Sequence, residues 1–123
     1  MDIKTVLNPE VINELLALET ETESPILTDL INMYLEQAPA RFKAIAEGFK
    51  TENYSIIEGE SHKLKSSSGS LGSQKLYEIF QEIEDCGRKK SSDGLLALLQ
   101  KAQPELVQVL KALEYVRSNK IPI

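Results

Sequence analysis

The stretch SHKLKSSSGSLGS, residues 61–73, combines a histidine with two lysines and a run of small residues. His62 is the only histidine in the chain, and Lys63 and Lys65 follow it closely. A neutral imidazole is a good nitrogen nucleophile, and neighbouring ammonium groups favour an anion at the same place. If the imidazole is exposed above small residues, this combination suggests that His62 accepts a phosphoryl group.

Helical spacing predicts that His62 is exposed. Residues recur three and four positions apart through this segment and define one face, which we take as the core face. At about 100° per residue, His62 points roughly 130° away from the centre of that face. The imidazole should therefore reach solvent. The predicted core face consists of Tyr54, Ile57, Ser61, Leu64, Ser68 and Leu71.

Small and charged residues surround His62 on the same exposed side of the helix. Lys65, one turn after His62, would place a cation beside a phosphoryl group on the imidazole. Glycine and serine weaken a helix, so their presence here suggests another use, namely to let a second protein approach closely. The predicted partner-access and docking surface consists of Glu58, Lys63, Ser66 and Gly69.

The rest of the chain reads as amphipathic helices joined by short polar turns, with no alternating strand pattern. This pattern predicts an all-α fold, an antiparallel four-helix bundle preceded by a short additional N-terminal helix. Pro39 and Pro104 are expected to bend helices without dividing them. The expected helices run from Asn8 to about Glu19, from Ser24-Pro25 to Phe49, from about Tyr54 to Leu71, from Ser73 to about Arg88, and from Ser92 to Arg117.

Composition limits the classes of partner and compartment. The chain has 123 residues, is 41% hydrophobic and 27% charged, and carries a formal net charge of -5, which is typical of one soluble domain spanning residues 1–123. An acidic balance disfavours nucleic acid and anionic lipid as partners. A single cysteine, Cys86, cannot form an internal disulfide, and no apolar signal core or membrane-spanning run is present. We expect a cytoplasmic protein that acts as a stand-alone carrier.

Catalytic alternatives lack the residues that they need. Exposed residues on one helix do not form the closed site of a nucleophilic triad. Glu82, Glu84 and Asp85 form an acidic cluster, but a di-iron bundle would need a second histidine and Glu-x-x-His pairs. There is no Walker loop, so we expect neither ATP binding nor kinase activity, and no metal or cofactor of the chain's own. A phosphoryl group would have to come from another protein.

The segment HKLKSSSGSLGS, followed by LYEIFQEIEDCGR, closely resembles the histidine phosphotransfer (HPt) domains of multistep phosphorelays. Their signature reads roughly His-x-Leu-Lys-Gly-Ser-x-x-x-Leu-Gly, followed by a helix that ends near Leu/Ile-Glu. The upstream FKAIAEGFKTENYSIIEGESHKL resembles the helix-turn-helix that leads into the motif. The matching residues are His62, Leu64, Lys65, Ser67, Leu71, Gly72 and Glu84.

The resemblance implies a bundle whose exposed histidine takes a phosphoryl group from an aspartyl phosphate on one receiver domain and gives it to another. The implied partners are receiver domains of response regulators or of a hybrid histidine kinase, with Mg²⁺ bound by the receiver, and we expect a monomer. Ser66 departs from the family's usual glycine. Its hydroxymethyl group could hydrogen-bond a phosphoryl oxygen but leaves less clearance, which keeps open the alternative of a non-transferring helical adaptor that docks receiver domains.

Overall fold

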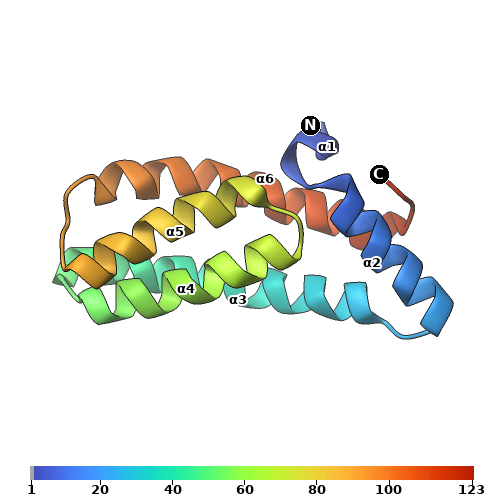
Figure 1. Ribbon diagram of the computed structural model, residues 1–123, viewed down its shortest axis with the longest axis horizontal. Coiled ribbons are helices and arrows are strands. Elements are labelled where there is room, and N and C mark those ends of the chain that lie inside the picture. Colours follow the sequence, from blue (N-terminus) through green and yellow to red (C-terminus); the bar gives the residue numbers. More distant parts are fainter. Residues whose placement is uncertain (1) are drawn as a thin grey trace.

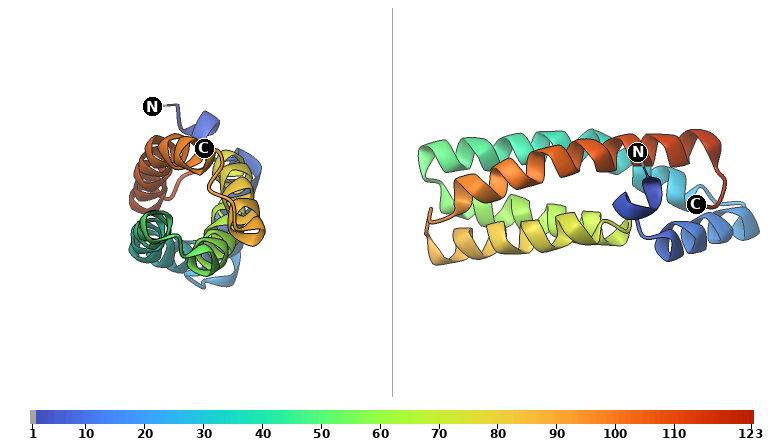
Figure 2. Two further views of the ribbon diagram at one scale, coloured as in Figure 1. Left: turned by 90° about the vertical axis from the view of Figure 1, so that its left-hand side faces the viewer. Right: turned by 90° about the horizontal axis from the view of Figure 1, so that it is seen from above.

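The computed structural model describes residues 2–123, which form six helices and no strand (Figure 1). The four long helices pack side by side as a bundle in which consecutive helices are antiparallel, as the end-on and top views show (Figure 2). The predicted all-α four-helix bundle is thereby confirmed. The helices are α1 (Ile3–Val6), α2 (Pro9–Thr22), α3 (Ile26–Thr51), α4 (Tyr54–Ser70), α5 (Gln74–Lys89) and α6 (Leu95–Asn119).

The N-terminal segment holds two helices where the sequence predicted one. Asp2 caps α1 by accepting a hydrogen bond from the Lys4 N–H, but four residues are too few to show a periodic pattern. Asn8 caps α2 with Pro9 at its first position, as predicted, and α2 continues past Glu19 to Thr22. Of the polar residues expected in the turn after Glu19, those at positions 20–22 are helical, whereas Glu23 and Ser24 lie outside α2.

The bundle helices differ in length, and the N-terminal helices occupy the space that this difference leaves. α3 has 26 residues and α4 has 17, so α3 is longer by about 14 Å at 1.5 Å per residue. α2 lies beyond the end of the α4–α5 hairpin and packs on α3, while α1 packs on α6 (Figures 1 and 2). The backbone N–H of Asn8 donates to the carbonyl of Gly72 (2.9 Å), which joins this segment to the α4–α5 turn.

The predictions made from Pro39 and from Ser24-Pro25 differ in how well they agree with the structure. Pro39 lies inside α3, which runs without a break, as predicted. At the start of α3, however, the expected cap Ser24 lies outside the helix, and Pro25 itself occupies the N-cap position with no side-chain hydrogen bond. Glu19 of α2 compensates, because its carboxylate accepts the backbone N–H of Thr28 (2.9 Å). A neighbouring helix thus supplies a contact that local spacing cannot predict.

The core face predicted for α4 is buried in the structure. Ile57, Ser61, Leu64 and Ser68 are at most 1% exposed. The Ser68 hydroxyl hydrogen-bonds the phenol of Tyr34 on α3 (2.9 Å), and burial raises the pKa of Tyr34 to about 12, so that phenol stays protonated. Burial of this face turns the opposite side of α4 toward solvent, which is where His62 lies.

The α4–α5 hairpin is closely packed because glycine allows the two backbones to approach. A Cβ atom added to Gly87 of α5 would lie 2.6 Å from the backbone nitrogen of Glu58 on α4. Such a contact is too short for a real methyl group, so any larger residue would push α4 and α5 apart. This close approach lets short side chains of one helix reach those of the other.

Two glycine-to-alanine substitutions are expected to change stability in opposite directions. Gly87→Ala overpacks the hairpin and should lower the free energy of unfolding by about 1–3 kcal/mol. Gly59 lies within α4, and a Cβ atom added there would have no atom within 4 Å. Gly59→Ala should therefore raise the free energy of unfolding by about 0.5–1 kcal/mol. Denaturant unfolding measures both variants against the parent. Equal effects of the two substitutions would contradict the packing described for Gly87.

Candidate functional site

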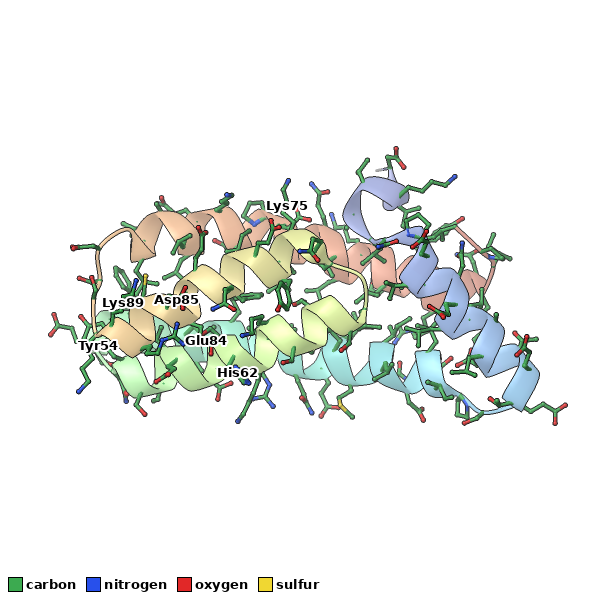
Figure 3. The ribbon with its side chains drawn as sticks, in the orientation of Figure 1. Tyr54, His62, Lys75, Glu84, Asp85 and Lys89 are labelled. Carbon is green, nitrogen blue, oxygen red and sulfur yellow. The ribbon has the colours of Figure 1, made fainter. Side chains whose placement is uncertain are left out.

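His62 lies on the exposed side of α4, as its helical position predicts. Its side chain is 59% exposed, and its Nδ1 atom lies 3.0 Å from Oε2 of Glu84 on α5. Figure 3 shows the imidazole and the carboxylate at the junction of the two helices. The histidine is therefore both open to solvent and fixed on one side by a neighbouring helix.

Glu84 joins His62 to Lys65. Its side chain is only 9% exposed, and its second oxygen, Oε1, lies 2.8 Å from the Lys65 ammonium. Lys65 also donates a hydrogen bond to the side-chain carbonyl of Gln81 (3.1 Å). A buried carboxylate is costly unless it is paired, and here a cation lies against one oxygen and an imidazole against the other.

The pKa of Glu84 reflects competition between burial and these contacts. Burial raises the pKa, but the hydrogen bonds and charges of Lys65 and His62 outweigh it and hold the pKa of Glu84 below its ordinary value. Glu84 is consequently ionised at neutral pH and can only accept hydrogen bonds. The Nδ1 atom of a neutral His62 must then carry the proton, which leaves the Nε2 lone pair free to act as the nucleophile.

Acid is expected to weaken the fold in part through Glu84. Because the pKa of folded Glu84 lies below the value of 4.5 expected in an unfolded chain, its ionised contacts stabilise the fold above that pH. This contribution is lost as the pH falls through the lower folded-state value. The stability advantage of the parent over Glu84→Gln should therefore shrink below about pH 4.5. Urea unfolding of the parent and of Glu84→Gln at a series of pH values measures this difference in stability. A difference that grows on acidification would contradict the lowered pKa of Glu84.

Lys65 is more enclosed than a surface lysine. Its side chain is 14% exposed, and its ammonium lies 6.0 Å from the centre of the Tyr77 ring on α5. Two of its three N–H donors face Glu84 and Gln81, so one donor remains for a further oxygen. Lys65 is thus held beside the histidine with part of its hydrogen-bonding capacity unused.

Comparison with known proteins identifies the family. The Hpt domain profile matches residues 29–119, from the first turn of α3 to the last residue of α6. The chain belongs to the Hpt domain family. Hpt domains carry a phosphoryl group on a histidine in multistep phosphorelays and interact there with receiver domains of response regulators, and membership of this family supports histidine phosphotransfer as the function of the domain.

One curated protein and one solved structure are similar to this chain. Over 95 residues, the Hpt domain is 24% identical to multistep phosphorelay regulator 1 of Schizosaccharomyces pombe, a match that covers 77% of this chain and 32% of that protein. The chain therefore spans about a third of the length of that relative. The crystal structure of histidine-containing phosphotransfer protein B (HptB) from Pseudomonas aeruginosa PAO1 shares the fold, with a TM-score of 0.79 at 17% identity, covering 91% of this chain and 94% of that one.

The four residues predicted as a docking surface have different environments in the Hpt domain. Lys63 and Ser66 are exposed, and Glu58 is half-buried because its backbone lies against Gly87. Gly69 lies under the Tyr77 ring, where an added Cβ would be 2.9 Å from the ring atom Cδ2. The small size of Gly69 is therefore required by a contact within the Hpt domain, whereas Ser66 faces solvent.

Sequence reasoning did not predict the α5 side of the site. From the sequence alone, Glu84 is a motif match and part of an acidic cluster, and neither Gln81 nor Tyr77 is predicted to lie at the site. One signal was present: Leu76, Phe80, Glu84 and Gly87 follow helical spacing on the buried face of α5. A carboxylate on an apolar stripe is almost always paired, so this position indicates a buried ionic contact.

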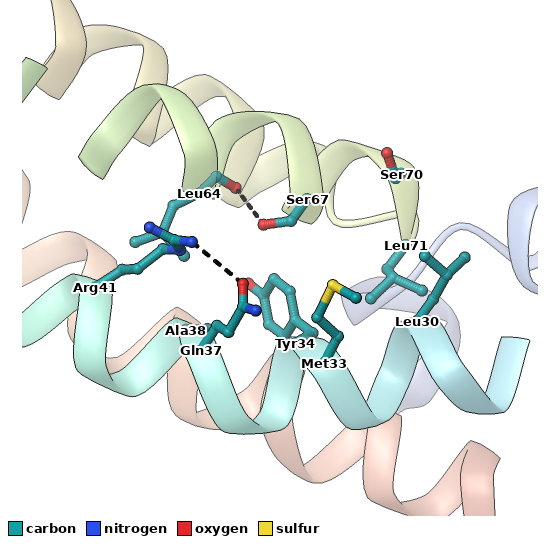
Figure 4. Close-up of a pocket in the computed structure, with 10 residues that line it drawn as sticks. All are labelled: Leu30, Met33, Tyr34, Gln37, Ala38, Arg41, Leu64, Ser67, Ser70 and Leu71. Carbon is teal, nitrogen blue, oxygen red and sulfur yellow. Dashed lines mark hydrogen bonds between the residues drawn. The ribbon is translucent and has the colours of Figure 1, made fainter. Parts of the chain in front are cut away.

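On the other side of α4, a narrow groove of about 100 Å³ runs between α3 and α4 (Figure 4). Its floor is mostly apolar, and Arg41 at its edge is paired with Gln37 and with Glu60. The charged side chains that contact His62 and Lys65 come from α5 and not from this groove.

Among residues 2–123, no three metal-ligating side chains lie together, and no helix is long and apolar enough to cross a membrane.

Proposed function

We propose that His62 is the phosphoryl acceptor of this Hpt domain and that Nε2 is the reacting atom. The observation that carries the proposal is the contact between Nδ1 of His62 and the ionised carboxylate of Glu84. This contact orients the imidazole and leaves Nε2 toward solvent, where a second protein can reach it. The same arrangement serves transfer in both directions, because the nucleophile of one step is the leaving group of the next.

The proposed donors and acceptors are aspartates of receiver domains, in response regulators or in a hybrid histidine kinase. In the accepting step, Nε2 attacks phosphorus in line with the aspartyl oxygen, and the phosphorus–oxygen bond breaks to leave a carboxylate. Lys65 is proposed to stabilise charge on the phosphoryl group with its remaining donor. We assign Mg²⁺ to the receiver, and we propose that this chain binds neither ATP nor a metal of its own.

The proposed docking surface around His62 consists of Glu58, Lys63 and Ser66, with Gly69 beneath Tyr77. A net charge of -5 supports a protein partner over nucleic acid. We further propose that the protein works as a monomer in the cytoplasm. The alternative of a non-transferring adaptor rests on Ser66, which occupies an exposed position one turn from the histidine.

The experiment that tests the proposal is transfer from a phosphorylated receiver domain. The protein should acquire phosphate that is labile in acid and stable in base, as a phosphohistidine is, and should pass it to a second, unphosphorylated receiver. Binding of the receiver without any transfer of phosphate would favour the adaptor instead.

A further inference from the structure

The segment that follows α6, residues 120–123, lies beside α2 (Figures 1 and 2). The carboxamide of Asn13 on α2 pairs with both main-chain groups of Ile123: Nδ2 donates to the oxygen (3.1 Å), and Oδ1 accepts from the N–H (2.8 Å). We propose that residues 120–123 form a strap that holds α2 closed against α3, so that α2 opens and closes as a unit separate from the four-helix bundle. This inference does not depend on the role of His62.

The sequence of the strap favours its bound shape. Lys120 ends α6 in the left-handed conformation (φ 51°), with its N–H bonded to the carbonyl of Val116 (2.9 Å), and this turn directs the chain out of α6. Pro122 fixes its own φ and favours an extended conformation at Ile121. The half-buried Ile123 side chain packs against the core. A short segment with so little freedom loses little entropy when it is ordered on α2.

α2 depends on the strap because its own packing is limited. It buries two of its 14 residues, Ile12 and Leu16, whereas α5 buries six of 16. Its extensive helix contact among residues 2–123 is with α3. Segments that bury little apolar surface open locally before the whole protein unfolds. Additional contacts from the strap, outside the α2–α3 contact, therefore decide how often α2 opens.

The strap contacts α2 at two separate places. The pairing of Ile123 with Asn13 lies in the first half of α2, and the Lys120 ammonium lies 3.8 Å from the carboxylate of Glu19 in the last turns. α2 and the strap lie on opposite sides, in sequence, of the matched residues 29–119. The two segments therefore form a unit of their own at one end of the bundle.

Opening of α2 would also free the start of α3. The Thr28 N–H donates to the carboxylate of Glu19 (2.9 Å), because Pro25 at the N-cap has no side-chain hydrogen bond to offer. The turn of α3 that follows carries Leu30 and Met33, which line the groove between α3 and α4. The strap therefore acts, through α2, on the order of one wall of that groove.

Residue-resolved hydrogen exchange of the full chain tests the strap. Asn13→Asp keeps the size of the side chain, removes the donor to Ile123 and places a negative charge beside the main-chain oxygen. We expect the amides of α2 and of Thr28 to exchange about tenfold faster than in the parent, because loss of one hydrogen bond changes an opening equilibrium by about this factor. The amides of α4 and α5 should keep their parent rates.

Asn32→Asp is the matched control. It makes the same chemical change at an exposed position on α3, where the side-chain oxygen accepts a hydrogen bond from Arg117 (2.9 Å) and a carboxylate can do the same. This variant should keep the parent's exchange rates in α2. Parent rates in α2 of Asn13→Asp would overturn the proposal. Equal acceleration of α2 and α5 would also overturn it, because the two helices would then open together.

A substitution in the strap itself gives a second test. Pro122 is exposed, so Pro122→Gly removes no buried contact and mainly increases the freedom of the unbound strap. Exchange in α2 should become about two- to fivefold faster. In the parent, α2 amides should already exchange faster than α5 amides. Unchanged α2 exchange in Pro122→Gly, or α2 amides as slow as those of α5 in the parent, would contradict the strap even if Asn13→Asp failed to fold.

Discussion

Replacing His62 with glutamine is expected to abolish phosphoryl acceptance while leaving the fold nearly unchanged. The imidazole is 59% exposed and contributes nothing to the buried core, so its removal should change the free energy of unfolding by no more than about 0.5 kcal/mol. The amide of glutamine can still donate to Glu84, which keeps the buried carboxylate paired. It cannot serve as a nitrogen nucleophile, because its lone pair is delocalised into the carbonyl group.

Two measurements on the same preparation check this expectation: phosphate transfer from a phosphorylated receiver and the midpoint of thermal unfolding. Because the chain has one histidine, all acid-labile, base-stable phosphate should disappear in His62→Gln. Retention of that phosphate would place the acceptor at another residue. A large fall in the unfolding midpoint with loss of transfer would instead indicate a structural role for His62.

Size at position 66 is expected to control access to the imidazole. Ser66 is exposed one turn after His62, and its hydroxyl makes no hydrogen bond within residues 2–123. Ser66→Gly should preserve or speed transfer, whereas Ser66→Leu and Ser66→Gln should slow it by about 100-fold, since small displacements of reacting groups have effects of this size. Helix propensity predicts the reverse order for stability, with glycine lower and leucine higher by a few tenths of a kcal/mol.

The diagnostic result is therefore that transfer rate and stability change in opposite directions across the substitutions at position 66. Ser118→Leu provides a control, because it adds the same bulk at an exposed serine on α6. It should leave transfer unchanged. If Ser66→Leu transfers as fast as the parent, clearance is not what Ser66 provides, and a tolerated helix position becomes the better explanation.

The features that sequence reasoning predicted are those that depend on one helix at a time. Apolar spacing and caps located the four bundle helices, and the 100° repeat of α4 was enough to place His62 opposite its buried face. The contact with Glu84 was not predictable in this way. It depends on how far α4 is shifted along α5 and how closely the two helices approach, and the absence of a side chain at Gly87 permits that approach.

Other differences have the same origin in contacts between segments. Gly69 was interpreted as clearance for a partner, but its neighbour is Tyr77 on α5. The start of α3 was assigned to a cap at Ser24, but a carboxylate from α2 satisfies the backbone there. α1 was missed for a different reason, since a one-turn helix has no periodicity to detect. At Gly69 and at the start of α3, a contact from a neighbouring helix therefore adds to what the local sequence indicates, and the docking role of Gly69 stays a prediction.

The two glycine contacts of the hairpin lie on either side of the reactive pair. Gly87 receives the backbone of Glu58 one turn before His62, and Gly69 receives the Tyr77 ring two turns after it. The distance from Nδ1 of His62 to Glu84 is therefore governed by how closely α4 and α5 pack, and not by the exposed side chains of Lys63 and Ser66. Those outward-facing positions can diverge during evolution to recognise new receivers while the reacting atoms keep their separation. The choice of partner can in this way change while the chemistry of phosphoryl transfer stays the same.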